Sequence, residues 1–221
     1  MKHITLFAGH YGSGKTNIAV SVAKYLKKQG FDTAVVDLDI VNPYFRTKDS
    51  EDEFKKLGIQ FVCSEYANTN LDAPALPKEI YSVLTDENVK IIMDIGGDDR
   101  GAVALGRYTP SILEENDYDM MFVANCYRPL TTTPEEAFEV MREIEAACQI
   151  PFTAIVNNSN IGEETTAADV IASFEYIEKL SKLSGLPVKM TTATKKICEE
   201  LKKKALDVFE IELQKKYYSI K

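Results

Sequence analysis

The sequence predicts a three-layer α/β/α domain with a mainly parallel sheet. Short apolar runs alternate with amphipathic stretches along the chain, as strands alternate with helices in parallel sheets. The apolar runs are continuous, which is typical of strands covered on both faces. A glycine-rich segment at 9–16 lies directly between the first apolar run and the first amphipathic stretch. These three observations together indicate the fold class.

Seven segments are expected to form strands because each is a short apolar run. In chain order they are 4–8, 33–37, 59–62, 89–94, 118–124, 151–157 and a short last strand at 186–189. Ligands of such sheets bind at the carboxyl ends of the strands. The residues that follow these runs are therefore the candidates for a functional site.

Helices are expected between the strands, and the first covers 17–26. Another begins where Thr133 can cap it and Pro134 occupies its first position, with two glutamates at the positive end of the helix dipole. A further apolar stripe marks a helix near 170–177. The last helix is expected from about 194 to 214, where apolar residues recur at helical spacing.

Residues 9–16 complete the pattern G-x-x-x-x-G-K-[ST], the phosphate-binding loop or P-loop. Its glycines let backbone N–H groups turn inward around a phosphate, and the Thr16 hydroxyl can bind Mg²⁺. Lys15 places a positive charge on the outer phosphates and is a candidate catalytic residue. A glycine-rich turn without a ligand is the alternative, and the flanking strand and helix argue against it. The residues predicted to bind the nucleotide here are Gly12, Ser13, Gly14, Lys15, Thr16 and Asn17.

Two acidic residues, Asp37 and Asp39, end the second expected strand. Alternate side chains of a strand share a face, so both can point toward one cavity. Asp39 lies just past the strand and is the candidate for positioning the attacking water. Asp37 is the candidate beside the metal ion and its waters. Both are predicted to act in catalysis, and a solvated turn rich in Asp, Asn and Pro is the alternative.

The fourth expected strand ends in Asp94, which Gly96 and Gly97 follow in the Walker B arrangement. The Asp94 carboxylate is expected to hold Mg²⁺, through water, together with Thr16. The two glycines let the backbone approach the γ-phosphate, so that loss of this phosphate can move the loop. The charged residues at 98–100 form either a solvated turn or part of a second substrate's pocket.

Polar residues also follow two later strands. Asn157 and Asn158 each carry an amide that offers a donor and an acceptor, so either can read the edge of a nucleobase. A turn at the strand end is the alternative. Arg128 follows the strand at 118–124 and can contact a phosphate or a partner, or lie on the surface.

In order and approximate spacing, these segments resemble the MinD/ParA/CobQ-type P-loop proteins, within the signal-recognition and MinD-like class of NTPases. The resemblance covers roughly residues 3–190. It implies a P-loop NTPase domain of about seven or eight strands that binds Mg-ATP, with Asp39 as the acid that positions water. It also implies that Thr16 and Asp94 serve the metal ion and that one of the two late asparagines lies at the adenine.

One part of the P-loop departs from this family. MinD and ParA proper carry Lys-Gly-Gly-x-Gly-Lys-[ST], and their first lysine crosses a dimer interface to the partner's phosphates. Here His10 and Tyr11 stand at that lysine and at the glycine after it, and neither supplies the same fixed charge. The chain therefore looks more like a side branch of the CobQ/CobB kind. The departure argues against a sandwich dimer activated by that lysine and leaves a homodimer open.

The site suits three functions. The leading prediction is a Mg-dependent ATPase whose nucleotide state switches the loops at 39–48 and 95–103. The second is an ATP-dependent ligase or kinase for a small carboxylate metabolite, as in the CobB and dethiobiotin-synthetase branches, with 44–46 and 98–100 lining the acceptor pocket. The third is an ATP-binding regulator that does not hydrolyse ATP. The second substrate or protein partner stays open.

Composition indicates the number of domains, the classes of partner and the cellular location that are expected. The chain has 221 residues, 45% hydrophobic and 27% charged, which suits one nucleotide-binding domain over 1–221. The formal charge of −8 argues against a broad non-specific hold on nucleic acid. No membrane-length apolar run, secretory signal or cysteine framework is present, so a cytoplasmic protein is expected. MinD-like proteins can carry a membrane-binding tail, but a helix packed on the sheet better explains the C-terminal stripe.

Overall fold

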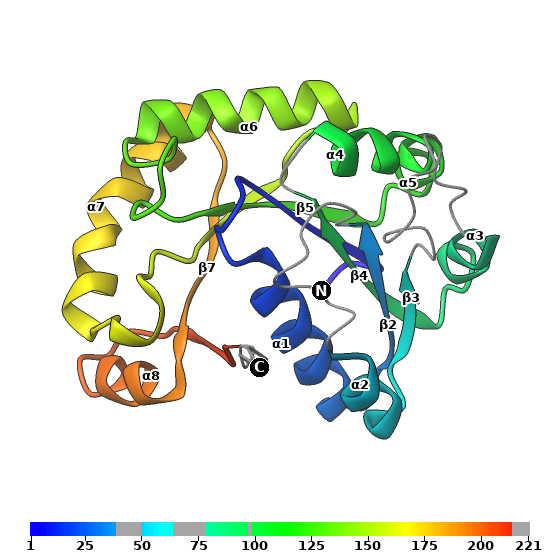
Figure 1. Ribbon diagram of the computed structural model, residues 1–221, viewed down its shortest axis with the longest axis horizontal. Coiled ribbons are helices and arrows are strands. Elements are labelled where there is room, and N and C mark those ends of the chain that lie inside the picture. The colour runs from blue at the N-terminus through cyan, green and yellow to red at the C-terminus, as the bar shows by residue number, and fades with distance from the viewer. Residues whose placement is uncertain (39–49, 64–77, 97–98, 214–221) are drawn as a thin grey trace, which may run out of the picture.

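The computed structural model describes residues 1–38, 50–63, 78–96 and 99–213 (Figure 1). Within these ranges eight strands form one sheet in the order β3-β2-β4-β1-β5-β6-β7-β8, and all neighbouring pairs are parallel. The strands are β1 Ile4–Ala8, β2 Asp32–Leu38, β3 Gln60–Cys63, β4 Val89–Ile95, β5 Tyr118–Ala124, β6 Ala154–Asn157, β7 Val188–Thr194 and β8 Phe209–Ile211. The predicted residues that lie outside the described ranges are Asp39, 44–46, Gly97 and Asp98.

Helices cover both faces of the sheet, which confirms the three-layer α/β/α fold of a P-loop NTPase (Figure 1). On one face, Phe7 and Ile92 pack against α1 and α2. On the other, Ile4 and Met93 pack against α3 to α7. No described helix has the length and apolar composition of a membrane-spanning segment. The helices are α1 Lys15–Lys28, α2 Glu51–Leu57, α3 Lys78–Leu84, α4 Asp99–Gly106, α5 Thr109–Glu115, α6 Pro134–Cys148, α7 Ala167–Ser184 and α8 Lys195–Lys202.

Helix α6 begins where the sequence predicts. The Thr133 hydroxyl accepts a hydrogen bond from the Glu136 N–H at 3.2 Å, and the Glu136 carboxylate accepts one from the Thr133 N–H at 3.1 Å. This capping box satisfies backbone donors that have no partner inside the helix. Pro134 occupies the first helical turn, as expected.

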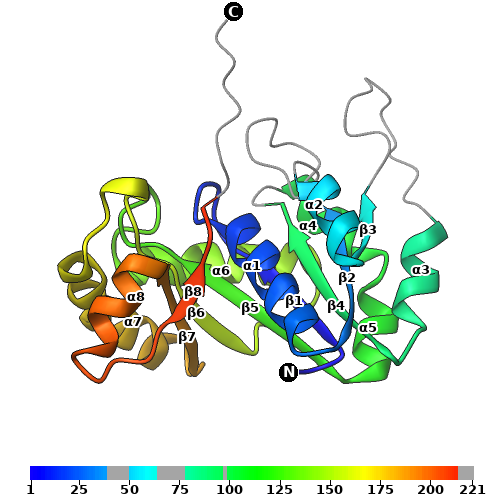
Figure 2. The same cartoon turned by 90° about the horizontal axis from the view of Figure 1, so that it is seen from below.

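The predicted last helix is wrong beyond Lys202. There α8 ends, Ala205 adopts a left-handed conformation with φ 58°, and Phe209–Ile211 form β8, parallel to β7 (Figure 2). A few apolar residues over so short a window fit a strand as well as a helix. The ring of Phe209 meets the ring of Tyr25 in α1 edge-on, with centroids 5.6 Å apart. Packing against α1 thus favours the strand.

Two strands also differ from the prediction by more than one residue at an end. β6 begins at Ala154 rather than at 151. β7 covers Val188–Thr194 rather than 186–189. Its second half is rich in threonine and forms no apolar run, although β-branched threonine suits a strand. Hydropathy alone therefore ended this strand too early.

Candidate functional site

The P-loop follows β1 at the carboxyl edge of the sheet, as predicted. β1 lies between β4 and β5, so the ends of both strands flank the loop. Gly14 has φ 90°, and a Cβ there would lie 2.2 Å from Nδ2 of Asn158. A Cβ on Gly9 would lie 2.5 Å from the carbonyl oxygen of Val123. Both positions need glycine because the backbone approaches its neighbours too closely for a side chain.

The two late asparagines are buried and bonded to protein groups. Nδ2 of Asn158 donates to the Ser13 carbonyl oxygen at 2.6 Å, and Oδ1 of Asn158 accepts from the Thr192 hydroxyl at 2.6 Å. Nδ2 of Asn157 donates to the Ser173 hydroxyl oxygen at 2.8 Å. Asn158 therefore ties the P-loop to β7. Contact of either amide with a nucleobase stays a prediction.

The three residues predicted at the metal ion lie on one face of the sheet. The Thr16 hydroxyl donates to Oδ2 of Asp94 at 2.7 Å, which joins the first turn of α1 to the end of β4. Asp37 and Asp94 are opposite one another in the pair of β2 and β4. Residues in register on neighbouring parallel strands point to the same face. Thr16, Asp37 and Asp94 are all buried, with exposed fractions of 8%, 5% and 0%.

These groups fit a magnesium ion. Two carboxylates and a hydroxyl offer oxygen atoms, the ligands that Mg²⁺ prefers. In nucleotide sites Mg²⁺ takes one or two protein carboxylates and completes its shell with phosphates and water. The described residues contain no group of three or more His, Cys, Asp and Glu side chains that could hold a metal ion.

Two other P-loop side chains, those of Lys15 and His10, contact the backbone of the loop itself. Nζ of Lys15 donates to the His10 carbonyl oxygen at 3.3 Å, so the lysine folds back over the loop. Nδ1 of His10 lies 3.1 Å from the Tyr11 carbonyl oxygen, and Tyr11 itself is 55% exposed. The Ser13 hydroxyl is buried and has no hydrogen-bond partner within the described ranges. Asn17 lies in the first turns of α1.

A third asparagine, which the sequence interpretation missed, connects two loops at this edge. Oδ1 of Asn125 accepts from the N–H groups of Tyr127 and Asn160, at 3.0 and 3.3 Å. Its Nδ2 donates to the Asn160 carbonyl oxygen at 3.1 Å. Asn125 follows the apolar run of β5, the same signal that singled out Asn157. Thr192 and Ser173 carry no such signal, because they are ordinary polar residues of β7 and α7.

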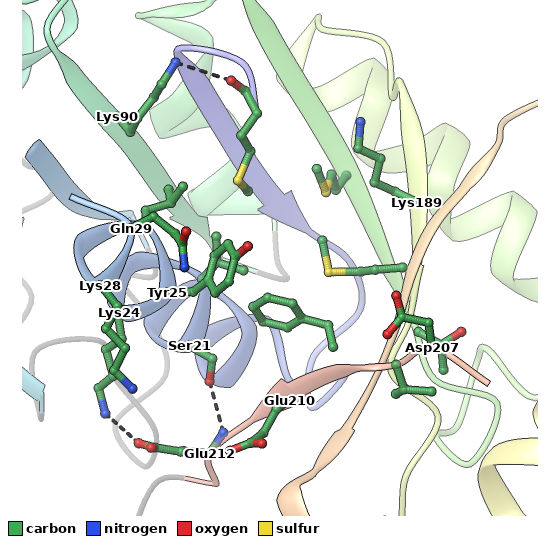
Figure 3. A pocket seen from close by; sticks show the side chains of 18 of the residues that line it. Ser21, Lys24, Tyr25, Lys28, Gln29, Lys90, Lys189, Asp207, Glu210 and Glu212 are labelled. Carbon is green, nitrogen blue, oxygen red and sulfur yellow. Dashed lines mark hydrogen bonds and ion pairs between the residues drawn. The ribbon is translucent and has the colours of Figure 1, made fainter. Parts of the chain in front are cut away.

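Two cavities lie near the C-terminal strands. A small one at the carboxyl edge is lined by Asn158, Asn160 and Thr192, together with residues at the ends of β7 and β8. A groove of about 870 Å³ lies between α1, β7 and β8 (Figure 3). At its wall, Lys24 pairs with Glu212 at 2.7 Å. None of the predicted site residues that the structure describes lines this groove.

Comparisons with known proteins identify the family and the fold. The CobQ/CobB/MinD/ParA nucleotide binding domain matches residues 4–180. The signal recognition particle 54 kDa protein of Pyrobaculum aerophilum is 28% identical over 119 residues, which make up 42% of this chain and 28% of that protein. The match therefore spans little more than a quarter of this relative.

Solved structures share the fold. The cell division protein FtsY of Thermotoga maritima has a TM-score of 0.62 at 15% identity, over 89% of this chain and 63% of that one. The signal recognition particle receptor FtsY of Elizabethkingia anophelis in complex with GDP has a TM-score of 0.56 at 17% identity, over 97% and 61%. At these identities the likeness concerns the fold alone, whereas the family match covers most of the chain. The chain belongs to the family of CobQ/CobB/MinD/ParA nucleotide-binding domains.

Proposed function

We propose that this protein is a Mg²⁺-dependent ATPase that acts as a nucleotide-dependent switch. Its family supports nucleotide binding in general, and ATP, Mg²⁺ and hydrolysis are the specific parts of the proposal. The observation that carries it is the 2.7 Å hydrogen bond between Thr16 and Asp94. It brings a P-loop hydroxyl and a Walker B carboxylate together, with Asp37 on the neighbouring strand.

Each group of the site has a task in this proposal. Backbone N–H groups between Gly12 and Thr16 bind the phosphates, and Lys15 exchanges its contact with the loop carbonyl for the outer phosphates. Thr16 and Asp94 would hold Mg²⁺, which neutralises charge on the phosphates. Asp39, the second residue after Asp37 in the sequence, would position the attacking water.

We infer ATP rather than GTP from the resemblance to the MinD/ParA/CobQ-type proteins, which implies a domain that binds Mg-ATP. Adenine presents one donor and one acceptor side by side, which an amide can match. Guanine presents two neighbouring donors, for which a carboxylate is the better partner. The amide of Asn158 is bonded to Ser13 and Thr192, so a contact with adenine would require it to exchange one of these partners.

We also infer that residues 1–221 act as one nucleotide-binding domain, because the apolar clusters on both faces are built on the same sheet. A sandwich dimer through a lysine at position 10 is not part of the proposal, since histidine stands there. Gel filtration with and without ATP tests whether a homodimer forms by another route.

The proposal is tested by phosphate release and by binding of fluorescent ATP and GTP, with Mg²⁺ or with EDTA. We expect Mg²⁺-dependent turnover of ATP above that of GTP, and its loss in Lys15→Ala and Asp39→Ala. Lys28→Ala is the matched control, because this exposed lysine lies at the other end of α1. Absence of hydrolysis in the wild type would contradict the ATPase proposal.

Two other outcomes would identify the alternative functions. Tight ATP binding without phosphate release, under every condition, would indicate a non-hydrolysing regulator. Turnover that appears only when a carboxylate metabolite is added would indicate a ligase or kinase.

A further inference from the structure

Arg128 lies against the P-loop, although it is far from the loop in the sequence. It follows β5, which pairs with β1. A Cβ on Gly12 would lie 3.7 Å from Nε and 3.8 Å from Cδ of Arg128. Gly12 has φ 75° and stands in the middle of the phosphate-binding motif. The stem of the arginine therefore rests on the backbone that would surround a phosphate.

The guanidinium of Arg128 has no partner within the described ranges. Its Nε is buried and donates no hydrogen bond to any residue there, and no ion pair of this side chain occurs among those residues. A guanidinium is always protonated and offers five N–H donors. Leaving a buried donor unpaired is destabilising. The arrangement therefore suits an anion that binds beside the loop.

The loop that carries Arg128 is held in a defined shape. The Arg128 N–H donates to the Asn125 carbonyl oxygen at 3.2 Å, and the Arg128 carbonyl oxygen accepts from the Thr131 N–H at 3.3 Å. The Thr131 hydroxyl donates to the Asn125 carbonyl oxygen at 2.9 Å, and the Tyr176 hydroxyl donates to that of Thr131 at 2.9 Å. An arginine on such a loop is already positioned, so less freedom is lost on binding.

We propose that Arg128 binds the phosphates of the nucleotide from within the same chain. Arginine can bind phosphate oxygens through two parallel N–H bonds. It would supply a second fixed positive charge beside Lys15, at a loop where His10 stands at the position of the lysine of MinD and ParA proper. The inference rests on the proposed nucleotide binding and adds to it a residue that the P-loop motif does not contain.

Equilibrium binding of fluorescent ATP and ADP, measured at several salt concentrations, tests this role. Arg128→Gln removes the charge and keeps much of the side-chain length, whereas Arg128→Lys keeps a charge. Arg107→Gln is the matched control, because Arg107 is exposed in the turn after α4. Thermal melting without nucleotide reports whether each variant is folded.

We expect R128Q to bind both nucleotides roughly ten- to a hundredfold more weakly, as for a lost hydrogen bond to a charged group. R128K should be intermediate and R107Q unchanged. Affinity should also depend less on salt in R128Q, because one phosphate contact is gone. If R128Q melts below the wild type, nucleotide affinity is compared between R128K and the wild type instead. The affinity of R128K should then depend on salt as that of the wild type does.

Binding by R128Q within twofold of the wild type would overturn the inference. Weaker binding with an unchanged salt dependence would also overturn it, since that result indicates a disturbed loop rather than a lost phosphate contact. A wild-type protein that binds neither nucleotide would instead contradict the proposed function, so the two failures are distinguishable.

Discussion

Replacing Asn158 by alanine tests whether this side chain holds the P-loop in shape. The change removes the donor that contacts the Ser13 carbonyl oxygen at 2.6 Å. Thr192 loses one acceptor but keeps another, the Asn157 carbonyl oxygen at 3.4 Å. One buried acceptor is therefore left without a partner, which costs about 1–3 kcal/mol. The space left by the amide adds about 1 kcal/mol.

The sum predicts that N158A is less stable by roughly 2–4 kcal/mol, which lowers the melting temperature by roughly 5–15 °C in a chain of this size. Urea and thermal denaturation followed by circular dichroism measure the loss. Fluorescent ATP binding at a temperature where the variant is folded measures the effect on the loop, and we expect weaker binding. Asn88→Ala is the control, because Asn88 is an exposed asparagine bonded only to Asp86 within the described ranges.

Two results would refute this reasoning. N158A could melt within about 2 °C of the wild type, which would mean that the Ser13 carbonyl finds another donor at little cost. Alternatively, N158A could lose stability and yet bind ATP as tightly as the wild type. The second result would show that Asn158 supports the fold without shaping the phosphate site.

Three further changes have expected outcomes. Gly14→Ala should abolish tight nucleotide binding, because its methyl group would overlap Asn158. Gly30→Ala is the control, because Gly30 has φ 89° and open space around it. It should lower the unfolding free energy by about 1 kcal/mol through backbone strain and leave binding intact. Thr16→Val should remove the gain in ATP affinity that Mg²⁺ gives over EDTA, and an unchanged gain would contradict the metal assignment. Thr133→Ala should lower the unfolding free energy by about 1 kcal/mol through loss of the cap, without affecting ATP binding; a binding defect would contradict that separation.

Features built from neighbouring residues could be predicted from the sequence. The strand, loop and helix around the P-loop follow one another directly, and so do the two partners of the α6 cap, Thr133 and Glu136. The carboxylates Asp37 and Asp94 were also recognisable, because each lies near the end of an apolar run. In these cases the physical cause and the signal lie in the same few residues.

Features that depend on distant contacts could not be predicted. The amide of Asn158 at a strand end predicts a hydrogen bond to some polar group. No neighbouring residue in the sequence indicates that this group is the Ser13 carbonyl oxygen. In the sequence alone, Arg128 can contact a phosphate, contact a partner or lie on the surface. Only the fold brings it to Gly12. The apolar residues of 208–213 fit either period over so short a window, and only packing against α1 distinguishes a strand from a helix.

The separation of Ser13 and Asn158 by 145 positions determines when the phosphate site can form during synthesis. The loop is synthesised before the strands that surround it. β1 pairs only after β4 and β5 have been made, and the Ser13 carbonyl meets its donor only after the end of β6 has been made. Contacts between residues so far apart in the chain form slowly. A nascent chain that stops before β6 lacks the donor for Ser13. Nucleotide binding is thus a signal of completed folding, and a nucleotide that binds only the native state stabilises the finished protein rather than its precursors.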